Sequence, residues 1–269
     1  MRTAVPAPSI LREILEHKRH EVAVARRLAP LAHLEAAIAS APAPRRFSAA
    51  LAAAEGLAVI AECKRASPSR GPIAPAPWRP VEVAQHYQAG GAACLSVLTD
   101  TRYFWGQRED LVEVRAATDL PCLRKDFIVD PWQVFESRAL GADAVLLIAA
   151  ALEGGALGEL LAACSEAGVE ALLEVHDAEE AERAIAAGAT LVGVNNRDLS
   201  TFEVDLDTTV RLAPRLRAAG CLVVGESGVS EPGEAARLAG AGVRAVLVGE
   251  ALVRAEDAGA LIAALKEAG

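Results

Sequence analysis

The chain has 269 residues, of which 52% are hydrophobic and 23% charged, and its formal net charge is −9. This composition gives a globular protein enough apolar side chains for a core, and no run approaches the ~20 apolar residues that span a bilayer. Nucleic-acid binding relies on a basic surface. We therefore expect neither a membrane nor a nucleic acid as partner.

The N-terminus and the cysteines both indicate the cytoplasm. The first residues lead directly into a charged helical pattern and lack the apolar segment and cleavage site of a signal peptide. The cysteines are odd in number, widely spaced and without a CxxC pair, which argues against disulfides and a zinc site. They are Cys63, Cys94, Cys122, Cys164 and Cys221. We expect reduced, buried thiols.

Residues 1–56 are predicted to form a helical extension that packs on the main domain. Ser9, after Pro8, is the expected N-cap of a first helix. An apolar stripe at helical spacing follows it: Ile10, Leu11, Ile14, Leu15 and Val22. His17 and His20 lie one turn apart beside two glutamates, a pattern more typical of a solvated helix face than of a metal site.

From residue 57 onward, β-branched runs alternate with amphipathic stretches that end in glycine, which predicts a parallel sheet. Eight strands are expected, within residues 57–64, 93–100, 121–128, 142–150, 170–177, 190–198, 221–229 and 244–252. Eight consecutive βα units favour closure into a barrel over the alternative, a doubly wound open sheet. The prediction is α/β: a single (β/α)8 TIM barrel over residues 57–269 with an N-terminal helical extension.

The loop that follows the first strand, ASPSRGPIAPAPWRP at residues 66–80, is long and rich in proline and glycine. Loops of this length in a compact domain are usually functional. We expect a lid over the chemistry, held near it by the Ser-Pro-Ser segment.

Charged and polar side chains stand at the carboxyl ends of five predicted strands. They are Glu62, Lys64, Lys125, Glu174, Asn195, Arg197 and Glu226. Because these strand ends share one mouth in a TIM barrel, we expect the side chains to converge there. Several acids with two lysines suit general acid–base catalysis. His176 alone does not supply the ligands of a zinc site, so no metal is expected.

Glycine-containing turns follow the last two predicted strands. Barrels often bind phosphate at these two places through backbone N–H groups and a helix N-terminus. The expected phosphate cradle consists of Ser227, Gly228, Gly249 and Glu250.

The motifs IAECKRASPSRG, SVLTDTRYFWGQREDL, PCLRKDFIVDPWQV, ALLEVHD, GVNNRDLSTFEVD and GESGVS together resemble those of the indole-3-glycerol phosphate synthase family. The resemblance covers almost the whole chain. It implies conversion of the phosphorylated small molecule 1-(2-carboxyphenylamino)-1-deoxyribulose 5-phosphate into indole-3-glycerol phosphate, with loss of carbon dioxide and water and without a cofactor. The activity would be that of a carboxy-lyase of tryptophan biosynthesis.

The resemblance also implies roles for the catalytic residues. Lys125 would be the general acid that protonates the ribulose carbonyl as the ring carbon attacks. Lys64 would lie by the substrate carboxylate and assist the loss of hydroxide, with Glu62 orienting it. Glu174 would be the partner acid or base of the dehydration. Asn195 and Glu226 would hold the sugar hydroxyls and the catalytic groups.

Further binding residues follow from the same resemblance. Ser67 would reach the phosphate side, and Arg197 would either bind phosphate or brace the site through an ion pair. The anthranilate ring would be walled by Pro68, Phe104, Phe127 and Leu199. Trp105 and Val253 differ from the residues most common at these positions in the family motifs, and both lie outside the catalytic set.

Three rival functions remain open. A Schiff-base aldolase barrel would use Lys125 as a covalent nucleophile. A phosphoribosylanthranilate isomerase would need a strand-one cysteine as base, but Cys63 faces away from Glu62 and Lys64. A non-catalytic barrel would only bind a phosphorylated ligand. We expect a monomer or weak homodimer, and contact with other enzymes of tryptophan biosynthesis is left open.

Overall fold

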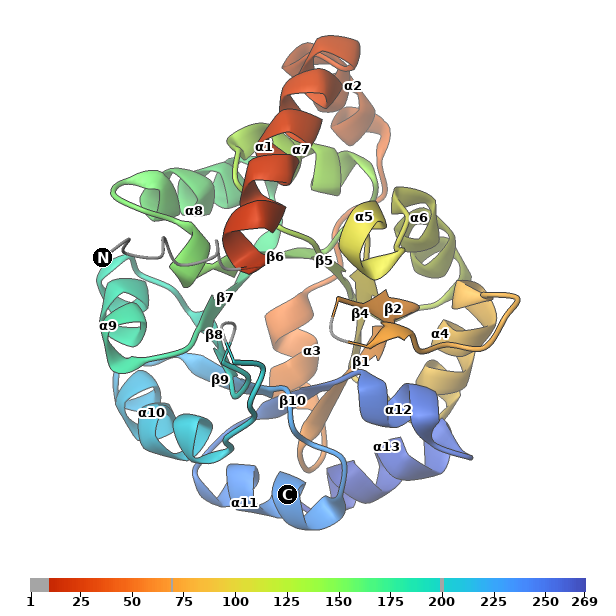
Figure 1. The fold of residues 1–269 in the computed structure, drawn as a ribbon, viewed down its shortest axis with the longest axis vertical. Helices are drawn as coiled ribbons and strands as arrows, with labels where there is room; N and C mark the ends of the chain where they lie inside the picture. Colours follow the sequence, from red (N-terminus) through yellow and green to blue (C-terminus); the bar gives the residue numbers. More distant parts are fainter. Residues whose placement is uncertain (1–9, 69, 199–200) are drawn as a thin grey trace, which may run out of the picture.

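The computed structural model describes residues 10–68, 70–198 and 201–269. At its centre is a closed barrel of parallel strands in the order β1, β10, β9, β8, β7, β6, β5, β4 (Figure 1). The strands are β1 (Ala58–Cys63), β4 (Cys94–Leu98), β5 (Cys122–Lys125), β6 (Ala144–Ile148), β7 (Glu170–Val175), β8 (Leu191–Asn195), β9 (Leu222–Glu226) and β10 (Ala245–Val248). Each predicted strand range contains one of them, so the predicted TIM barrel is confirmed.

Helices surround the barrel in the order in which the chain visits the strands (Figure 1). They are α4 (Pro80–Ala89), α5 (Thr101–Phe104), α6 (Arg108–Ala117), α7 (Pro131–Ala139), the 3-10 turn η1 (Ala149–Ala151), α8 (Ala156–Ala167), α9 (Ala178–Ala186), α10 (Asp207–Ala218), α11 (Pro232–Gly240), α12 (Glu250–Arg254) and α13 (Ala258–Glu267). Strand side chains alternate between two apolar clusters. Val59 and Cys63 pack outward against the helices, whereas Ile60 and Leu123 fill the barrel.

Three helices precede the barrel: α1 (Ile10–Leu28), α2 (Leu31–Ser40) and α3 (Phe47–Ala53). Helix α3 closes the amino end of the barrel, because Phe47 and Leu51 are fully buried among its inward-facing side chains. Burial of each such side chain stabilises the fold by about 2 kcal/mol. Pro8 and Ser9, the expected helix entry, lie outside the described residues.

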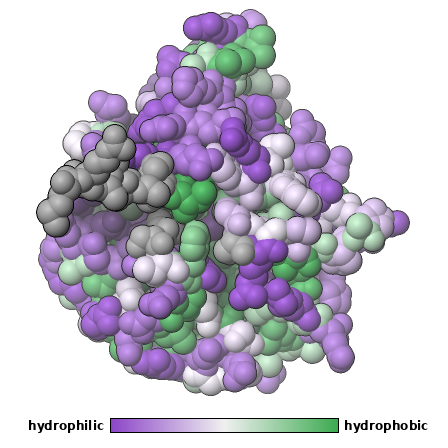
Figure 2. Space-filling model, in the orientation of Figure 1, coloured by the Kyte–Doolittle hydropathy of each residue, from purple (hydrophilic) through white to green (hydrophobic). Residues whose placement is uncertain are grey.

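Helix α1 packs its predicted apolar stripe inward. Ile14, Leu15 and Val22 are buried, while hydrophilic residues dominate the visible surface of the helix (Figure 2). At the N-terminal end of the stripe, Ile10 and Leu11 line the mouth of the barrel. The extension therefore contributes side chains to the site.

A buried charged cluster, not predicted from the sequence, fastens α1 to the barrel. We call it the α1 clasp: Lys18, Asp100, Arg124, Asp126 and Glu136. The Lys18 Nζ lies 3.0 Å from Asp100 Oδ2 and 2.9 Å from Asp126 Oδ1, and its side chain is 2% exposed. Arg124 Nη1 donates to Glu136 Oε2 at 2.7 Å. Although burial alone would raise the pKa of Asp126, the charges of Arg124 and Lys18 lower it to about 2.

The loop after β1 carries two short antiparallel strands, β2 (Ala66–Ser67) and β3 (Gly71–Pro72). The backbone N–H groups of Ile73 and Ala74 both donate to the carbonyl of Arg65, which fixes the base of the loop. Its role as a lid stays a prediction.

All five cysteines are buried and free, as predicted. In the parts of the chain that the structure describes, no helix combines the length and apolar content needed to cross a membrane.

Candidate active site

A cavity of about 400 Å³, the mouth cavity, opens at the carboxyl ends of the barrel strands, and this volume suits a small-molecule ligand. Its lining includes every predicted site residue that the structure describes: Glu62, Lys64, Ser67, Pro68, Phe104, Lys125, Phe127, Glu174, Asn195, Arg197, Glu226, Ser227, Gly228, Gly249 and Glu250. Leu199 lies outside the described residues. Side chains separated by up to 188 positions in sequence thus share one cavity, as the strand-end pattern predicts.

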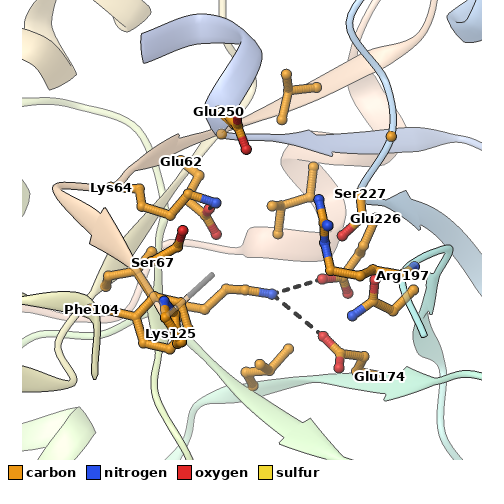
Figure 3. Close-up of a pocket in the computed structure, with 18 of the residues that line it drawn as sticks. Glu62, Lys64, Ser67, Phe104, Lys125, Glu174, Arg197, Glu226, Ser227 and Glu250 are labelled. Carbon is orange, nitrogen blue, oxygen red and sulfur yellow. Dashed lines mark hydrogen bonds and ion pairs between the residues drawn. The ribbon is translucent and has the colours of Figure 1, made fainter. Parts of the chain in front are cut away.

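Lys125, the last residue of β5, points into the cavity between two carboxylates (Figure 3). Its Nζ lies 2.8 Å from Glu226 Oε2 and 3.5 Å from Glu174 Oε2. Burial opposes the ammonium form, but the charges of Glu226 and Glu174 outweigh it and raise the pKa of Lys125. The amine is therefore held protonated.

The two carboxylates beside Lys125 differ in acidity. Burial works to raise the pKa of Glu174, but Lys125, His176 and a hydrogen bond with Asn195 lower it below its ordinary value. At Glu226 burial prevails over the attraction of Lys125 and raises the pKa to about 7. Such a split assigns opposite tasks to neighbouring acids. Glu174 is fitted to act as a base, and Glu226 holds a proton near neutral pH.

A second ion pair lies across the cavity at the end of β1. Lys64 Nζ is 3.0 Å from Glu62 Oε1, and the Glu62 side chain is 4% exposed. A Cβ at Gly249 would clash with this carboxylate, and one at Gly193 would clash with the Glu226 carboxylate, so a larger residue at either position would displace that glutamate. Among the described residues, Glu62 Oε2 and Glu226 Oε1 are buried without a hydrogen-bond partner. Unpaired buried acceptors that line a cavity are positions for ligand contacts.

The turns after β9 and β10 form the expected cradle at one end of the cavity. Ser227 and Gly228 both have left-handed backbone, with φ of 62° and 87°. The side chain of Glu250 is occupied by Arg70 and Arg254, whose Nε atoms lie 3.1 and 3.0 Å from its Oε1. The Glu250 carboxylate is therefore already paired within the protein. The two arginines add positive charge to the same end.

Arg197 is braced by its own loop. Its backbone N–H donates to Asn195 Oδ1 at 3.0 Å, and its Nη1 donates to the carbonyl of Phe202, also at 3.0 Å. The side chain lines the cavity, so bracing and ligand binding are compatible.

An apolar wall faces the charged groups. The rings of Phe104 and Phe127 lie 6.1 Å apart in a tilted arrangement, which is a favourable separation for aromatic pairs. Pro68 continues the wall, and further apolar residues complete it: Ile10, Leu11, Ile14, Leu98, Leu146 and Ile148. A flat aromatic ligand can pack against this wall.

Several residues of the site escaped the sequence analysis. The strand interior of LVGVNN contains Gly193, and such a glycine signals a close approach that could have been noticed. Arg70 and Arg254 had no comparable signal, because single arginines in loops and short helices are common. His176 was considered only as a zinc ligand. Within the described residues, no group of three or more His, Cys, Asp or Glu side chains is arranged to hold a metal ion.

Comparisons with known proteins agree with this geometry. A family model described as indole-3-glycerol phosphate synthase matches residues 11–265. A protein of that name from Laribacter hongkongensis is 49% identical over 259 residues, covering 95% of this chain and 98% of the relative. One from Mycobacterium avium is 49% identical over 261 residues, covering 97% of this chain and 95% of the relative.

Two solved structures share the fold at low sequence identity. Thiamine phosphate pyrophosphorylase from Pyrococcus furiosus matches with a TM-score of 0.60 and 18% identity, covering 80% of this chain and 95% of that one. A 3-hexulose-6-phosphate synthase matches with a TM-score of 0.62 and 16% identity, covering 79% of this chain and 99% of that one. At this identity the likeness establishes the barrel alone.

Proposed function

The chain belongs to the indole-3-glycerol phosphate synthase family, and we propose that Lys125 is the general acid of its ring-closing step. The family reaction converts 1-(2-carboxyphenylamino)-1-deoxyribulose 5-phosphate into indole-3-glycerol phosphate with release of carbon dioxide and water. The chain is accordingly a carboxy-lyase of tryptophan biosynthesis. What requires a proposal is how its own residues divide the work.

The observation that supports the proposal is the Lys125 ammonium held between Glu174 and Glu226 in the mouth cavity. As the ring carbon attacks the ribulose carbonyl, the carbonyl oxygen gains negative charge and takes a proton from Lys125. The new carbon–carbon bond interrupts the aromaticity of the ring at the carbon that carries the carboxylate. The bond between that carbon and the carboxylate then breaks, carbon dioxide leaves, and the electron pair of the broken bond restores the aromatic ring.

Dehydration then removes the hydroxyl that the carbonyl has become. Lys64, paired with Glu62 at 3.0 Å, assists departure of this group as water. Glu174, whose pKa is lowered chiefly by the charge of Lys125 against the opposing effect of burial, takes the proton from the neighbouring carbon. Asn195 and Glu226 orient the sugar hydroxyls and the catalytic groups. Positioned acid–base groups of this kind accelerate reactions by about 10²- to 10⁴-fold each.

The substrate's other groups match the remaining surfaces of the cavity. Its phosphate fits the backbone N–H groups of Ser227, Gly228 and Gly249, with Ser67, Arg197 and Glu250 beside them. Its aromatic ring fits the wall of Pro68, Phe104 and Phe127, and its carboxylate lies by Lys64. The sequence prediction of Leu199 as a fourth wall residue stays a prediction.

The test is a spectroscopic assay of the purified chain with the carboxyphenylamino substrate in the presence of EDTA, alongside Lys125→Ala. Product from the parent, with tight substrate binding but no turnover in the variant, is the expected result. Borohydride reduction with the substrate present serves as the second arm. A covalent adduct on Lys125 would overturn general acid catalysis in favour of a Schiff base.

The setting of the enzyme is also proposed. The described part of the N-terminal extension, residues 10–56, works with the barrel as one structural unit, since Ile10, Leu11 and Ile14 line the same cavity as the barrel residues. We place the protein in the cytoplasm as a monomer or weak homodimer, and light scattering of the purified chain tests its oligomeric state.

A further inference from the structure

His176 links the base of the site to the helix behind it. It follows β7 directly, two residues after Glu174. Its Nε2 lies 3.4 Å from Glu174 Oε1, and its Nδ1 lies 3.1 Å from Glu180 Oε2 on α9. The backbone N–H of His176 donates to the same Glu180 oxygen at 2.8 Å. Glu180 therefore fixes the imidazole, and the second ring nitrogen is buried close to the Glu174 carboxylate without a hydrogen bond to any described residue.

This arrangement is shielded from water but does not touch the cavity. The side chains of His176, Glu174 and Glu180 are 15%, 4% and 13% exposed, and His176 is not part of the cavity lining. At such burial, solvent and salt screen neighbouring charges less than they do at the surface. Any influence of His176 on the reaction passes through Glu174.

The charged groups facing the imidazole are mainly acidic. They are Glu174 of β7, Glu226 of β9 and Glu180 of α9. Lys125 of β5 contacts the other oxygen of Glu174, and the neighbouring Asp177 carboxylate accepts the N–H of Glu180 as the cap of α9. Burial works against a cationic imidazole, but the hydrogen bond to Glu180 and the charge of Glu174 raise the pKa of His176.

We propose that His176, held by Glu180, is a positioning residue that keeps Glu174 ionised and aimed at Lys125. This inference rests on the proposed role of Glu174 as a base. Glu174 and Glu226 both contact Lys125, but Glu174 also has a second cationic neighbour at its Oε1. The imidazole thus adds to the charge of Lys125 in favouring the ionised form of Glu174.

The test is the pH profile of kcat/KM for His176→Gln, His176→Ala and Glu180→Gln, with His33→Asn on the exposed face of α2 as control. Without an imidazolium, Glu174 takes up a proton at higher pH. We expect His176→Gln and His176→Ala to lose about tenfold in kcat/KM near pH 6 and little near pH 8, as expected for removal of one neighbouring charge. Glu180→Gln should shift the profile in the same direction by less.

The loss should fall on kcat rather than KM, because His176 does not contact the ligand. If His176→Ala lost the same activity at every pH and His176→Gln kept the activity of the parent, the role of His176 would be packing. That result would overturn the inference. An unchanged pH profile in Glu180→Gln and His176→Gln would also overturn it. Glu180→Gln leaves the buried imidazole in place and so provides the test should the His176 variants fail to fold.

Glu174→Gln separates this inference from the proposed function. An active Glu174→Gln enzyme would remove Glu174 from the mechanism and take the inference with it. An inactive Glu174→Gln enzyme combined with an unshifted His176→Gln profile would overturn the inference alone.

Discussion

The neighbouring residues Lys125 and Asp126 belong to two different buried charged clusters, the mouth cluster and the α1 clasp. The two clusters differ in how completely their carboxylate oxygens are paired. In the α1 clasp both oxygens of Asp126 are engaged: Oδ2 accepts from Thr99 and Arg124, while Oδ1 accepts the Phe127 N–H and pairs with Lys18. In the mouth cluster (Glu62, Lys64, Lys125, Glu174 and Glu226), Glu62 Oε2 and Glu226 Oε1 are buried without a hydrogen-bond partner among the described residues. Asp100 Oδ2 of the clasp also lacks a hydrogen bond, but it lies 3.0 Å from the Lys18 Nζ. The oxygens available to a ligand are therefore those of the mouth cluster.

The carboxylates of the two clusters differ in acidity rather than in the balance of charge. Around the clasp, Lys18, Arg124 and Arg108 face Asp100, Asp126, Glu136 and Glu21. In the mouth cluster two lysines face three carboxylates. At Asp126 the charges of Arg124 and Lys18 outweigh burial and lower the pKa to about 2, whereas at Glu226 burial prevails and raises the pKa to about 7. The clasp therefore holds an ionised carboxylate in ion pairs, and the mouth cluster retains a proton for acid–base chemistry.

The largest effect is expected from removing a cation of the mouth cluster. Lys64→Met should reduce kcat/KM by roughly 10³-fold, because it deletes the partner of the substrate carboxylate and the assistance to dehydration. Its urea midpoint should change less than in Lys18→Met, since the Lys64 side chain is 18% exposed and that of Lys18 only 2%. Steady-state kinetics and urea unfolding measure both, with Lys266→Met as control. A large loss of stability with normal kcat/KM would contradict the comparison.

Removing the matching cation of the clasp should reverse this pattern. Lys18→Met leaves Asp100 and Asp126 buried beside an apolar side chain, which should lower the free energy of unfolding by about 4 kcal/mol. Activity per folded molecule should fall far less than in Lys64→Met. Urea unfolding compared with Lys266→Met measures the effect. A stable Lys18→Met that is catalytically dead would place Lys18 in the chemistry instead.

The proton on Glu226 should be visible in stability. Its pKa is about 7 in the folded chain against an ordinary 4.5, so the folded state loses stability as pH rises from the lower value to the higher. Glu226→Gln removes this loss. The free energy of unfolding of the variant relative to the parent should therefore increase as pH rises across that range. The total increase should be roughly 3 kcal/mol at pH values above the range. Urea unfolding at a series of pH values checks the trend, and a gain that shrinks with rising pH would have the wrong sign.

The smallest effect is expected from an exposed ion pair. Arg215 contacts Glu182 at 2.6 Å, and the two side chains are 53% and 55% exposed. Water and salt screen such pairs. Arg215→Ala should leave the urea midpoint and kcat/KM within experimental error of the parent. A loss approaching that of Lys18→Met would show that burial is not what separates the clusters.

The sequence predicted the barrel and the mouth cluster because both follow from local rules. Strand alternation places Glu62 beside Lys64, and parallel strands bring Lys125 and Glu226 to one end. The α1 clasp could not be predicted from such local rules. Lys18 sits among charged residues on α1 and resembles part of a solvated face, whereas its partners Asp100 and Asp126 lie more than 80 positions away.

The coupling of His176 to Glu174 was missed for a different reason. The two residues are close in sequence, but a histidine at a strand end has many possible partners. Its orientation depends on Glu180, which helix α9 brings back over the strand end. Arg70 and Arg254 likewise meet only at Glu250. Such pairings depend on the packing of loops and helices, which no local pattern encodes.

The most direct test of an open, proton-holding mouth cluster is infrared difference spectroscopy of parent against Glu226→Gln over a pH series. A protonated-carboxyl band that disappears with a midpoint near pH 7 in the parent, and is absent from the variant, is the predicted result. If no protonated carboxyl remains in the parent above about pH 5, where an ordinary glutamate is already ionised, the mouth cluster holds no proton and the account of its chemistry is wrong.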